Sequence, residues 1–151
     1  PVDFTGVVRD AVGAVAATAA QRGIVLRGDT AAQVTVPGDA GRLRQVADQL
    51  IGNALKFSPD GATVAVTLTT DGLAAQLTVS DTGIGIPDGE HRRMFRRLYR
   101  ATNARDGAIP GTGLGLTVSR VIVERHHGTI AVQPRDPVGT TVTVRLPAVV
   151  P

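Results

Sequence analysis

One stretch of strict alternation limits the folds that this sequence can adopt. From Thr63 to Asp81, apolar residues occupy every second position on both sides of an Asp-Gly pair at 71–72. A period of two is typical of strands buried on one face, and Asp-Gly is typical of a tight hairpin turn. The sequence therefore predicts an antiparallel hairpin. Counting by twos from Leu77 and Val79 places Asp81 on the buried face, where a carboxylate requires a partner.

Helical periodicity appears before and after this hairpin. We expect a first helix from Phe4 to about Arg22 and a second from about Gly41 to Phe57, with Asp39 as its N-cap. A third helix is expected from about Thr112 to His127, with Gly128 as its C-cap. This last helix is expected to place four apolar residues on one face: Leu114, Val118, Val121 and Ile122.

Short strands complete the predicted order of elements. Ile24–Arg27 and Val34–Val36 are expected to be strands separated by a Gly-Asp-Thr turn at 28–30. Thr129–Gln133 and Thr140–Leu146 are expected to form a closing hairpin. This order predicts an α/β two-layer sandwich, with a mixed, mostly antiparallel sheet and helices on one face.

Composition excludes several kinds of site and partner. The chain has no Cys, which excludes disulfides, thiolate zinc sites and thiol nucleophiles, and its three His leave little for a His metal site. The basic residues are almost all arginines, scattered except around 92–105, and aromatic residues are few, so nucleic-acid binding is not expected. No apolar run approaches the ~20 residues of a membrane span. We expect one soluble, intracellular domain over residues 1–151.

The second predicted helix has a polar border beside its apolar stripe. At 100° per residue, Gln49, Asn53 and Lys56 fall along this border, and Phe57 lies next to them. Two amides, an ammonium and an aromatic ring there suit a ligand site, and a solvated border is the alternative. The apolar stripe consists of Leu43, Val46, Ala47, Leu50 and Ala54.

Two glycine clusters flank a long connection. Asp81–Pro87 follows the hairpin and Gly111–Leu116 opens the last helix. Glycine lets backbone approach a ligand closely, and a helix N-terminus offers N–H groups to phosphate. Neither cluster fits a P-loop or a Rossmann turn, and protein-kinase signatures are absent. The segment between them, about 87–110, is longer than ordinary loops, which predicts a lid over a ligand.

Together, four ordered motifs resemble those of sensor histidine kinases. Asn53–Ser58 resembles their N-box, Asp81–Gly85 their first glycine box, Phe95–Arg100 their F-box and Gly111–Leu116 their second glycine box. The resemblance extends over essentially the whole chain. It implies the Bergerat-type ATP-binding sandwich, shared with gyrase, mismatch-repair and chaperone ATPases. It also implies a catalytic domain that binds Mg-ATP and transfers the γ-phosphoryl group to a His on a separate dimerisation domain.

The resemblance assigns roles to single residues. Asn53 would hold Mg²⁺ through its amide oxygen, Lys56 would meet the phosphates, and Asp81 would accept a hydrogen bond from the adenine amino group. Arg100 would reach the γ-phosphate, so Asn53, Lys56 and Arg100 are the candidate catalytic residues. The other predicted ATP-binding residues are Gln49, Phe57 (packed on the adenine), Gly83, Gly85, Tyr99, Arg105, Gly111, Thr112, Gly113, Leu114, Gly115 and Leu116.

One departure from the family pattern separates the alternatives. Gln49 stands where sensor kinases usually have Asn and the related ATPases have Glu. A neutral amide cannot act as the general base that activates water, which argues against a standalone ATPase. A non-catalytic nucleotide-sensing module would be indicated by loss of Asn53, Lys56 or the glycines, and all are present. Anti-sigma-factor serine kinases are a further alternative, which the F-box-like segment and the complete C-terminal box disfavour.

The chain offers no convincing phosphoacceptor. His91 falls in the predicted lid, and His126 and His127 end a helix, so all three are interpreted as structural or surface residues. The acceptor His is then expected in a dimerisation domain outside this sequence. The resemblance further implies a response regulator as downstream partner, and a cytoplasmic domain of a membrane-anchored sensor kinase.

Overall fold

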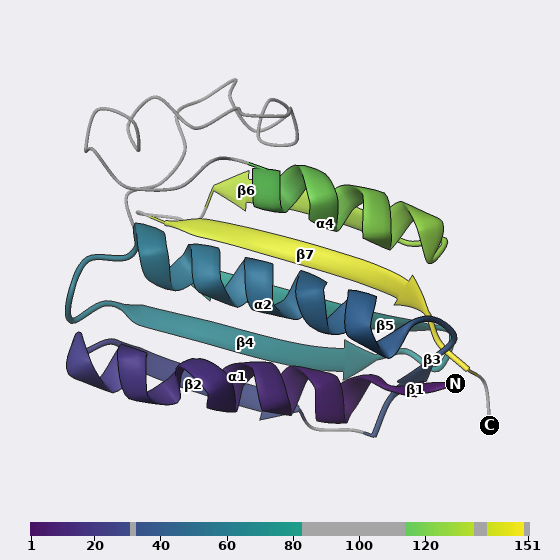
Figure 1. Cartoon of the computed structure of the whole chain (residues 1–151), viewed down its shortest axis with the longest axis horizontal. Coiled ribbons are helices and arrows are strands. Elements are labelled where there is room, and N and C mark those ends of the chain that lie inside the picture. Colours follow the sequence, from purple (N-terminus) through teal and green to yellow (C-terminus); the bar gives the residue numbers. More distant parts are fainter. Residues whose placement is uncertain (31–32, 83–113, 135–138, 150–151) are drawn as a thin grey trace.

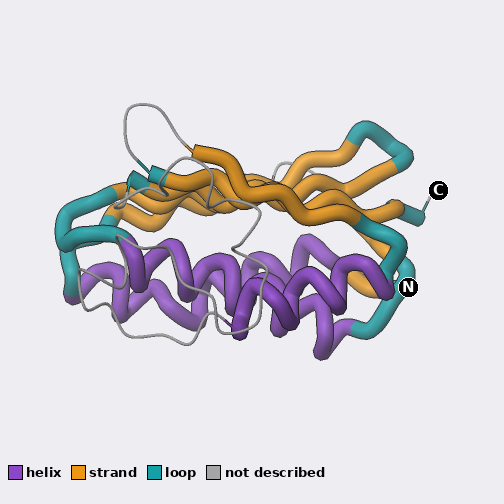
Figure 2. Tube along the Cα trace, turned by 90° about the horizontal axis from the view of Figure 1, so that it is seen from above, coloured by secondary structure: helices purple, strands orange, loops and turns teal. Residues whose placement is uncertain are grey.

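The computed structural model describes residues 1–30, 33–82, 114–134 and 139–149, which form two layers. Helices make one layer and strands the other (Figure 2). The helices are α1 (Phe4–Gln21), α2 (Ala40–Phe57) and α4 (Leu114–Arg125). The strands are β1 (Val2–Asp3), β2 (Val25–Thr30), β3 (Thr35–Val36), β4 (Thr63–Thr70), β5 (Ala74–Asp81), β6 (Thr129–Pro134) and β7 (Thr140–Pro147).

The sheet is mixed and mostly antiparallel, as predicted. Its five strands follow the order β2-β4-β5-β7-β6, and β1 and β3 form a separate two-stranded pair. β2 is parallel to β4, whereas β4–β5, β5–β7 and β7–β6 are antiparallel. All three described helices cover one face of this sheet (Figure 2). The predicted two-layer α/β sandwich is therefore confirmed.

The central hairpin supplies much of the core. β5 alternates between half-buried and buried positions, and so does β4 as far as Leu68. The buried residues Val66 and Leu68 face Val79 and Leu77 across the pair. Figure 1 shows α2 lying between α1 and α4, across the middle of the sheet. Every residue of the predicted apolar stripe of α2 is buried, and so are Ile51 and Leu55. Asp39 is the N-cap of α2, as predicted, because its Oδ1 accepts a hydrogen bond of 3.0 Å from the Arg42 N–H.

The region around residues 28–30 differs from the sequence prediction. Gly28, Asp29 and Thr30 do not form a turn but continue β2, and Thr30 pairs with Leu68. The parallel ladder with β4 supplies backbone partners that outweigh the local turn preference of Gly-Asp. Arg9 of α1 also donates from its Nε to the Thr30 Oγ1 over 2.9 Å. The strand β1 was not predicted, whereas β3 lies within the predicted strand Val34–Val36.

The last helix buries only part of the predicted face. Val118 and Val121 are 37% and 46% exposed, and the buried residues are Leu116, Ser119, Ile122 and Val123. The prediction is confirmed for Ile122 and wrong for Val118 and Val121, because the core-facing row includes the polar Ser119, which obscures the apolar stripe.

The end of α4 also differs from the prediction. The helix ends at Arg125, and His127 adopts the left-handed conformation with φ 63°. Gly128 was predicted to be the C-cap. Instead, its N–H closes the turn by donating to the Val123 carbonyl over 2.9 Å.

Candidate nucleotide-binding site

One end of the sheet gathers several of the predicted site residues that lie within the described ranges. The C-terminal end of α2, the end of β5, the beginning of β7 and the first described turn of α4 all lie at the same end of the molecule (Figure 1). The antiparallel order explains this convergence, because β5 ends where β4 and β7 begin. The same topology therefore brings the Asn53–Phe57 segment and Asp81 to one end of the sandwich.

Asp81 lies on the buried face of β5, as the alternation predicted. It is 7% exposed, and it pairs with Val64 of β4 on one side and Thr140 of β7 on the other. Thr82 continues the contact with β4: its N–H donates to the Thr63 carbonyl over 3.3 Å, and its Oγ1 accepts from the Thr63 N–H over 3.1 Å. The pairing with β4 and β7 thus fixes the backbone from which the Asp81 carboxylate projects, at the edge of the core.

The polar border of α2 leads towards the same end. Gln49, Asn53 and Phe57 are half-buried, and Lys56 is exposed in the last turn. A cation in the last turn also suits the helix dipole. Within the described residues, no cluster of three or more His, Asp or Glu forms a metal site. The neutral amide of Asn53 fits Mg²⁺ as one hard oxygen ligand beside nucleotide phosphates and water.

An arginine that sequence reasoning missed fixes the end of α2. Arg22, just after α1, donates from its guanidinium to the carbonyls of Leu55 and Ser58. Its Nε also bonds the Asp60 carboxylate over 2.9 Å. Leu55 lies in the last turn of α2 and Ser58 is its C-cap, so Arg22 adds a side-chain partner to carbonyls at the end of this helix. No sequence signal pointed to Arg22, because its partners lie more than 30 residues away.

His126 joins α4 to the beginning of α2. Its Nδ1 is 2.8 Å from the Ile122 carbonyl, and its Nε2 accepts from the Asp39 N–H over 3.1 Å. This pair of contacts requires the neutral ring with its proton on Nδ1. The interpretation of His126 as a structural residue is confirmed.

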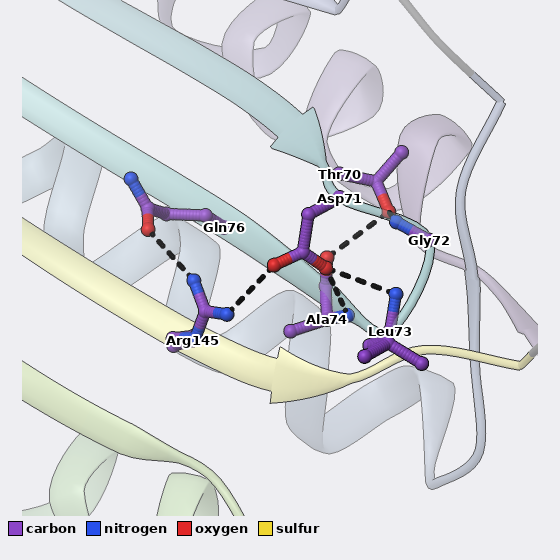
Figure 3. Close-up of polar contacts among 7 residues, drawn as sticks. All are labelled: Thr70, Asp71, Gly72, Leu73, Ala74, Gln76 and Arg145. Atoms are coloured by element: carbon purple, nitrogen blue, oxygen red, sulfur yellow. Dashed lines mark hydrogen bonds and ion pairs between the residues drawn. The ribbon is translucent and has the colours of Figure 1, made fainter.

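The opposite end of the sheet carries a carboxylate with a different role. Asp71 Oδ1 accepts from the N–H groups of Leu73 and Ala74 over 2.9 and 2.8 Å, and Oδ2 pairs with Arg145 over 2.9 Å (Figure 3). Arg145 also donates to Gln76. These backbone hydrogen bonds, with the arginine, lower the pKa of Asp71 from 3.8 to about 2. Asp71 stabilises the hairpin turn.

Part of the predicted site lies outside the described residues. This applies to the predicted lid at 87–110 and to His91, as well as to most of both glycine boxes. For Leu114 and Gly115 only the helical backbone is described, whereas Leu116 is buried in α4. The predicted site residues outside the described ranges are Gly83, Gly85, Tyr99, Arg100, Arg105, Gly111, Thr112 and Gly113.

Comparison with known proteins decides the family. The family model of histidine kinase-, DNA gyrase B- and HSP90-like ATPases matches residues 38–150. The chain belongs to this family. Within it, the chain is the ATP-binding catalytic domain of a sensor histidine kinase. Among the described residues, no helix is long and apolar enough to span a membrane.

The MprB proteins are the first of three relatives. The histidine-protein kinase/phosphatase MprB of Mycobacterium sp. (strain KMS) is 45% identical over 117 residues, which are 74% of this chain. The chain spans 22% of the length of that protein. The solved structure of a mycobacterial sensor histidine kinase MprB is 33% identical, with a TM-score of 0.89. The alignment covers 98% of this chain and 97% of that one.

Two further solved kinases have the same fold. Full-length ShkA in complex with AMPPNP is 26% identical with a TM-score of 0.84, and the alignment covers all of this chain and 31% of ShkA. The histidine kinase ThkA in complex with the response regulator protein TrrA is 19% identical with a TM-score of 0.81, over 98% of this chain and 41% of that chain. The similarity to ThkA is a similarity of fold.

Proposed function

We propose that this histidine-kinase domain binds Mg-ATP between the C-terminal half of α2 and the end of β5. The observation that carries the proposal is Asp81, a carboxylate 7% exposed on the core face at the site end of the sheet. The resemblance to histidine kinases assigns adenine recognition to this residue, and a carboxylate at the edge of the core is a strong acceptor for a donor such as the adenine amino group. The AMPPNP complex of ShkA supports an adenine nucleotide as the ligand.

Residues of α2 would hold the metal and the phosphates. Asn53 presents an amide oxygen that suits Mg²⁺, and Lys56 supplies a positive charge for the phosphates. Gln49 lies one turn before Asn53 on the same border and reaches the metal directly or through water. The resemblance to histidine kinases assigns the remaining phosphate contacts to the two glycine boxes, Tyr99, Arg100 and Arg105.

The proposed reaction is phosphoryl transfer to histidine. A nitrogen of the acceptor imidazole attacks the γ-phosphorus, the bond from that phosphorus to the bridging oxygen breaks, and ADP leaves. Catalysis of this kind relies on positioning and charge stabilisation, which Lys56 and Arg100 would provide together with the charge of a Mg²⁺ held by Asn53. The acceptor belongs to a dimerisation domain of the longer kinase.

The protein partner and the cellular location of this domain are those of the longer kinase. We assign a response regulator as the recipient of the phosphoryl group, which the complex of ThkA with TrrA supports. We place this domain on the cytoplasmic side of a membrane-anchored sensor kinase. Phosphorylation of a regulator by the assembled kinase in membrane vesicles tests both assignments.

Binding is tested by calorimetry on two aspartate variants. Wild-type protein is expected to bind Mg-ATP, and Asp81→Asn is expected to weaken binding by about 1–3 kcal/mol, because a neutral amide replaces a charged acceptor. Asp71→Asn is the matched control at the other end of the sheet and is expected to bind like wild type. Equal affinities for all three proteins contradict the assignment of Asp81.

The alternative of a standalone ATPase makes a different prediction. An ATPase requires a general base for water, and Gln49 cannot serve as one. The isolated chain is therefore expected to show little hydrolysis of ATP. Efficient hydrolysis that persists when Gln49 is replaced by Ala would favour the ATPase.

A further inference from the structure

A glycine at the beginning of β7 touches the backbone of Asp81. Gly139 is buried and has a backbone φ of +122°, a value that residues with a side chain rarely adopt. A Cβ added to Gly139 would lie 1.9 Å from the Asp81 carbonyl oxygen and 3.1 Å from the Thr82 Cα. No rotation of a side chain relieves this overlap, because both neighbours are backbone. Only glycine allows β7 to approach Asp81 this closely.

The other side of the same backbone is held by β4. Thr82 forms two hydrogen bonds with Thr63, one through its N–H and one through its Oγ1. The Asp81–Thr82 segment therefore lies between two fixed neighbours, with Thr63 on one side and Gly139 on the other. A displacement at either side moves the backbone from which the Asp81 carboxylate projects.

We propose that Gly139 is a positioning residue for recognition of adenine, acting with Thr82 to hold Asp81. Gly139 lies about 58 residues after Asp81 in the chain and does not touch the nucleotide through a side chain. Its role is to leave the space that fixes the Asp81 backbone. This inference rests on the proposed function, in which Asp81 accepts from the adenine amino group.

The test compares two nucleotides on matched glycine variants. Inosine triphosphate has a carbonyl where adenine has its amino group, and its sugar and phosphates are identical. Gly139→Ala is expected to weaken ATP binding by about tenfold or more and to leave inosine triphosphate binding nearly unchanged, because the lost hydrogen bond involves a charged acceptor. The ratio of the two affinities, measured by calorimetry, is the readout.

Two controls separate positioning from simple loss of stability. In Gly128→Ala, a Cβ would lie 2.3 Å from the Arg145 carbonyl oxygen, which reproduces the overlap near the other end of β7. Gly72 has a φ of +91° and no neighbour within 4 Å, so Gly72→Ala reproduces the strain alone. Both variants are expected to lower the melting temperature while keeping the wild-type ratio of ATP to inosine triphosphate affinity.

The outcomes distinguish this inference from the proposed function. If Asp81→Asn lowers the ratio and folded Gly139→Ala keeps it, the role of Gly139 is refuted and the adenine site stands. If Asp81→Asn itself keeps the ratio, the proposed adenine contact fails. Should Gly139→Ala not fold, Thr82→Val removes the Oγ1 contact with Thr63 and is expected to lower the ratio severalfold. An unchanged ratio in that variant overturns the inference.

Discussion

Two aspartates lie at the two ends of the central hairpin, and they differ in exposure and in the contacts that hold them. Asp71 is exposed at the turn, and its oxygens accept from two backbone N–H groups and pair with Arg145 (Figure 3). Asp81 is buried at the end of β5, between β4 and β7. The Asp71 carboxylate stabilises the turn of the hairpin. The position of Asp81 depends on the pairing of β5 with β4 and with β7.

The difference shows how one residue type divides between structure and function. A turn aspartate gains its partners from residues two and three positions along the chain, so its contacts form with the hairpin itself. A buried aspartate at a strand end offers a charged acceptor in a place of low dielectric, which strengthens its hydrogen bonds. We therefore expect loss of the Asp71 carboxylate to change stability and loss of the Asp81 carboxylate to change nucleotide binding.

The largest effect is expected for Asn53→Ala. Loss of the amide oxygen removes the proposed Mg²⁺ ligand, so phosphoryl transfer to the added dimerisation domain is expected to fall below detection. The measurement is acid-labile, alkali-stable label on that domain. Asp48→Ala is the control, since Asp48 lies on the same helix in an exposed ion pair with Arg44. Transfer that persists in Asn53→Ala contradicts the assignment.

Next in size is the loss of the contact between α1 and α2. Arg22→Ala removes the hydrogen bonds to the Leu55 and Ser58 carbonyls and is expected to lower the free energy of unfolding by about 1–3 kcal/mol. Urea denaturation measures this change. Arg22→Lys retains the positive charge but cannot donate to both carbonyls as the planar guanidinium does. It is expected to be more stable than Arg22→Ala and less stable than wild type. A variant as stable as wild type would show that the end of α2 does not need this arginine.

A smaller effect, of opposite sign, is expected at Ser119. This residue is fully buried in α4, and its Oγ has no hydrogen-bond partner among the described residues. Ser119→Ala removes a hydroxyl that lost its water on folding and is expected to raise the free energy of unfolding by about 1 kcal/mol. Thr117→Ala on the neighbouring half-buried position is a control without that gain. Destabilisation by Ser119→Ala would mean that the hydroxyl has a partner.

The smallest effect is expected for Asp71→Asn, and it depends on pH. The folded-state pKa of Asp71 is about 2, below its ordinary value of 3.8, so the charged form stabilises the fold at neutral pH. This contribution is fully present above about pH 4 and is lost as the pH falls towards 2. Urea midpoints of wild type and Asp71→Asn are therefore expected to differ at pH 7 and to converge in acid. A constant difference contradicts the role of the charge.

Local patterns and long-range contacts explain what the sequence could and could not predict. Alternation in the hairpin and the apolar stripe of α2 each repeat over many residues, so both elements and the inward direction of Asp81 were predicted correctly. β2 was predicted too short because pairing with β4 outweighs the Gly-Asp signal. The buried face of α4 was predicted correctly at Ile122 but not at Val118 and Val121, because Ser119 interrupts its apolar row.

The candidate site residues were predicted by motif, whereas the residues that support them in the structure were not. Asn53, Lys56 and Asp81 belong to ordered segments that resemble a known family. Arg22 and Gly139 act through contacts with backbone distant in sequence, and nothing in their own neighbourhoods marks them. Such residues become visible only when the strands and helices are placed in space.

Nuclear magnetic resonance of the labelled domain, titrated with Mg-ATP, tests the central claim most directly. If the nucleotide binds at the Asp81 end, the backbone amides of Asn53, Lys56, Asp81 and Thr82 will shift with ATP concentration. The amides of residues 70–74 at the opposite end will stay in place. Shifts confined to the hairpin turn, or saturating shifts that leave Asp81 and Asn53 unmoved, would contradict the account.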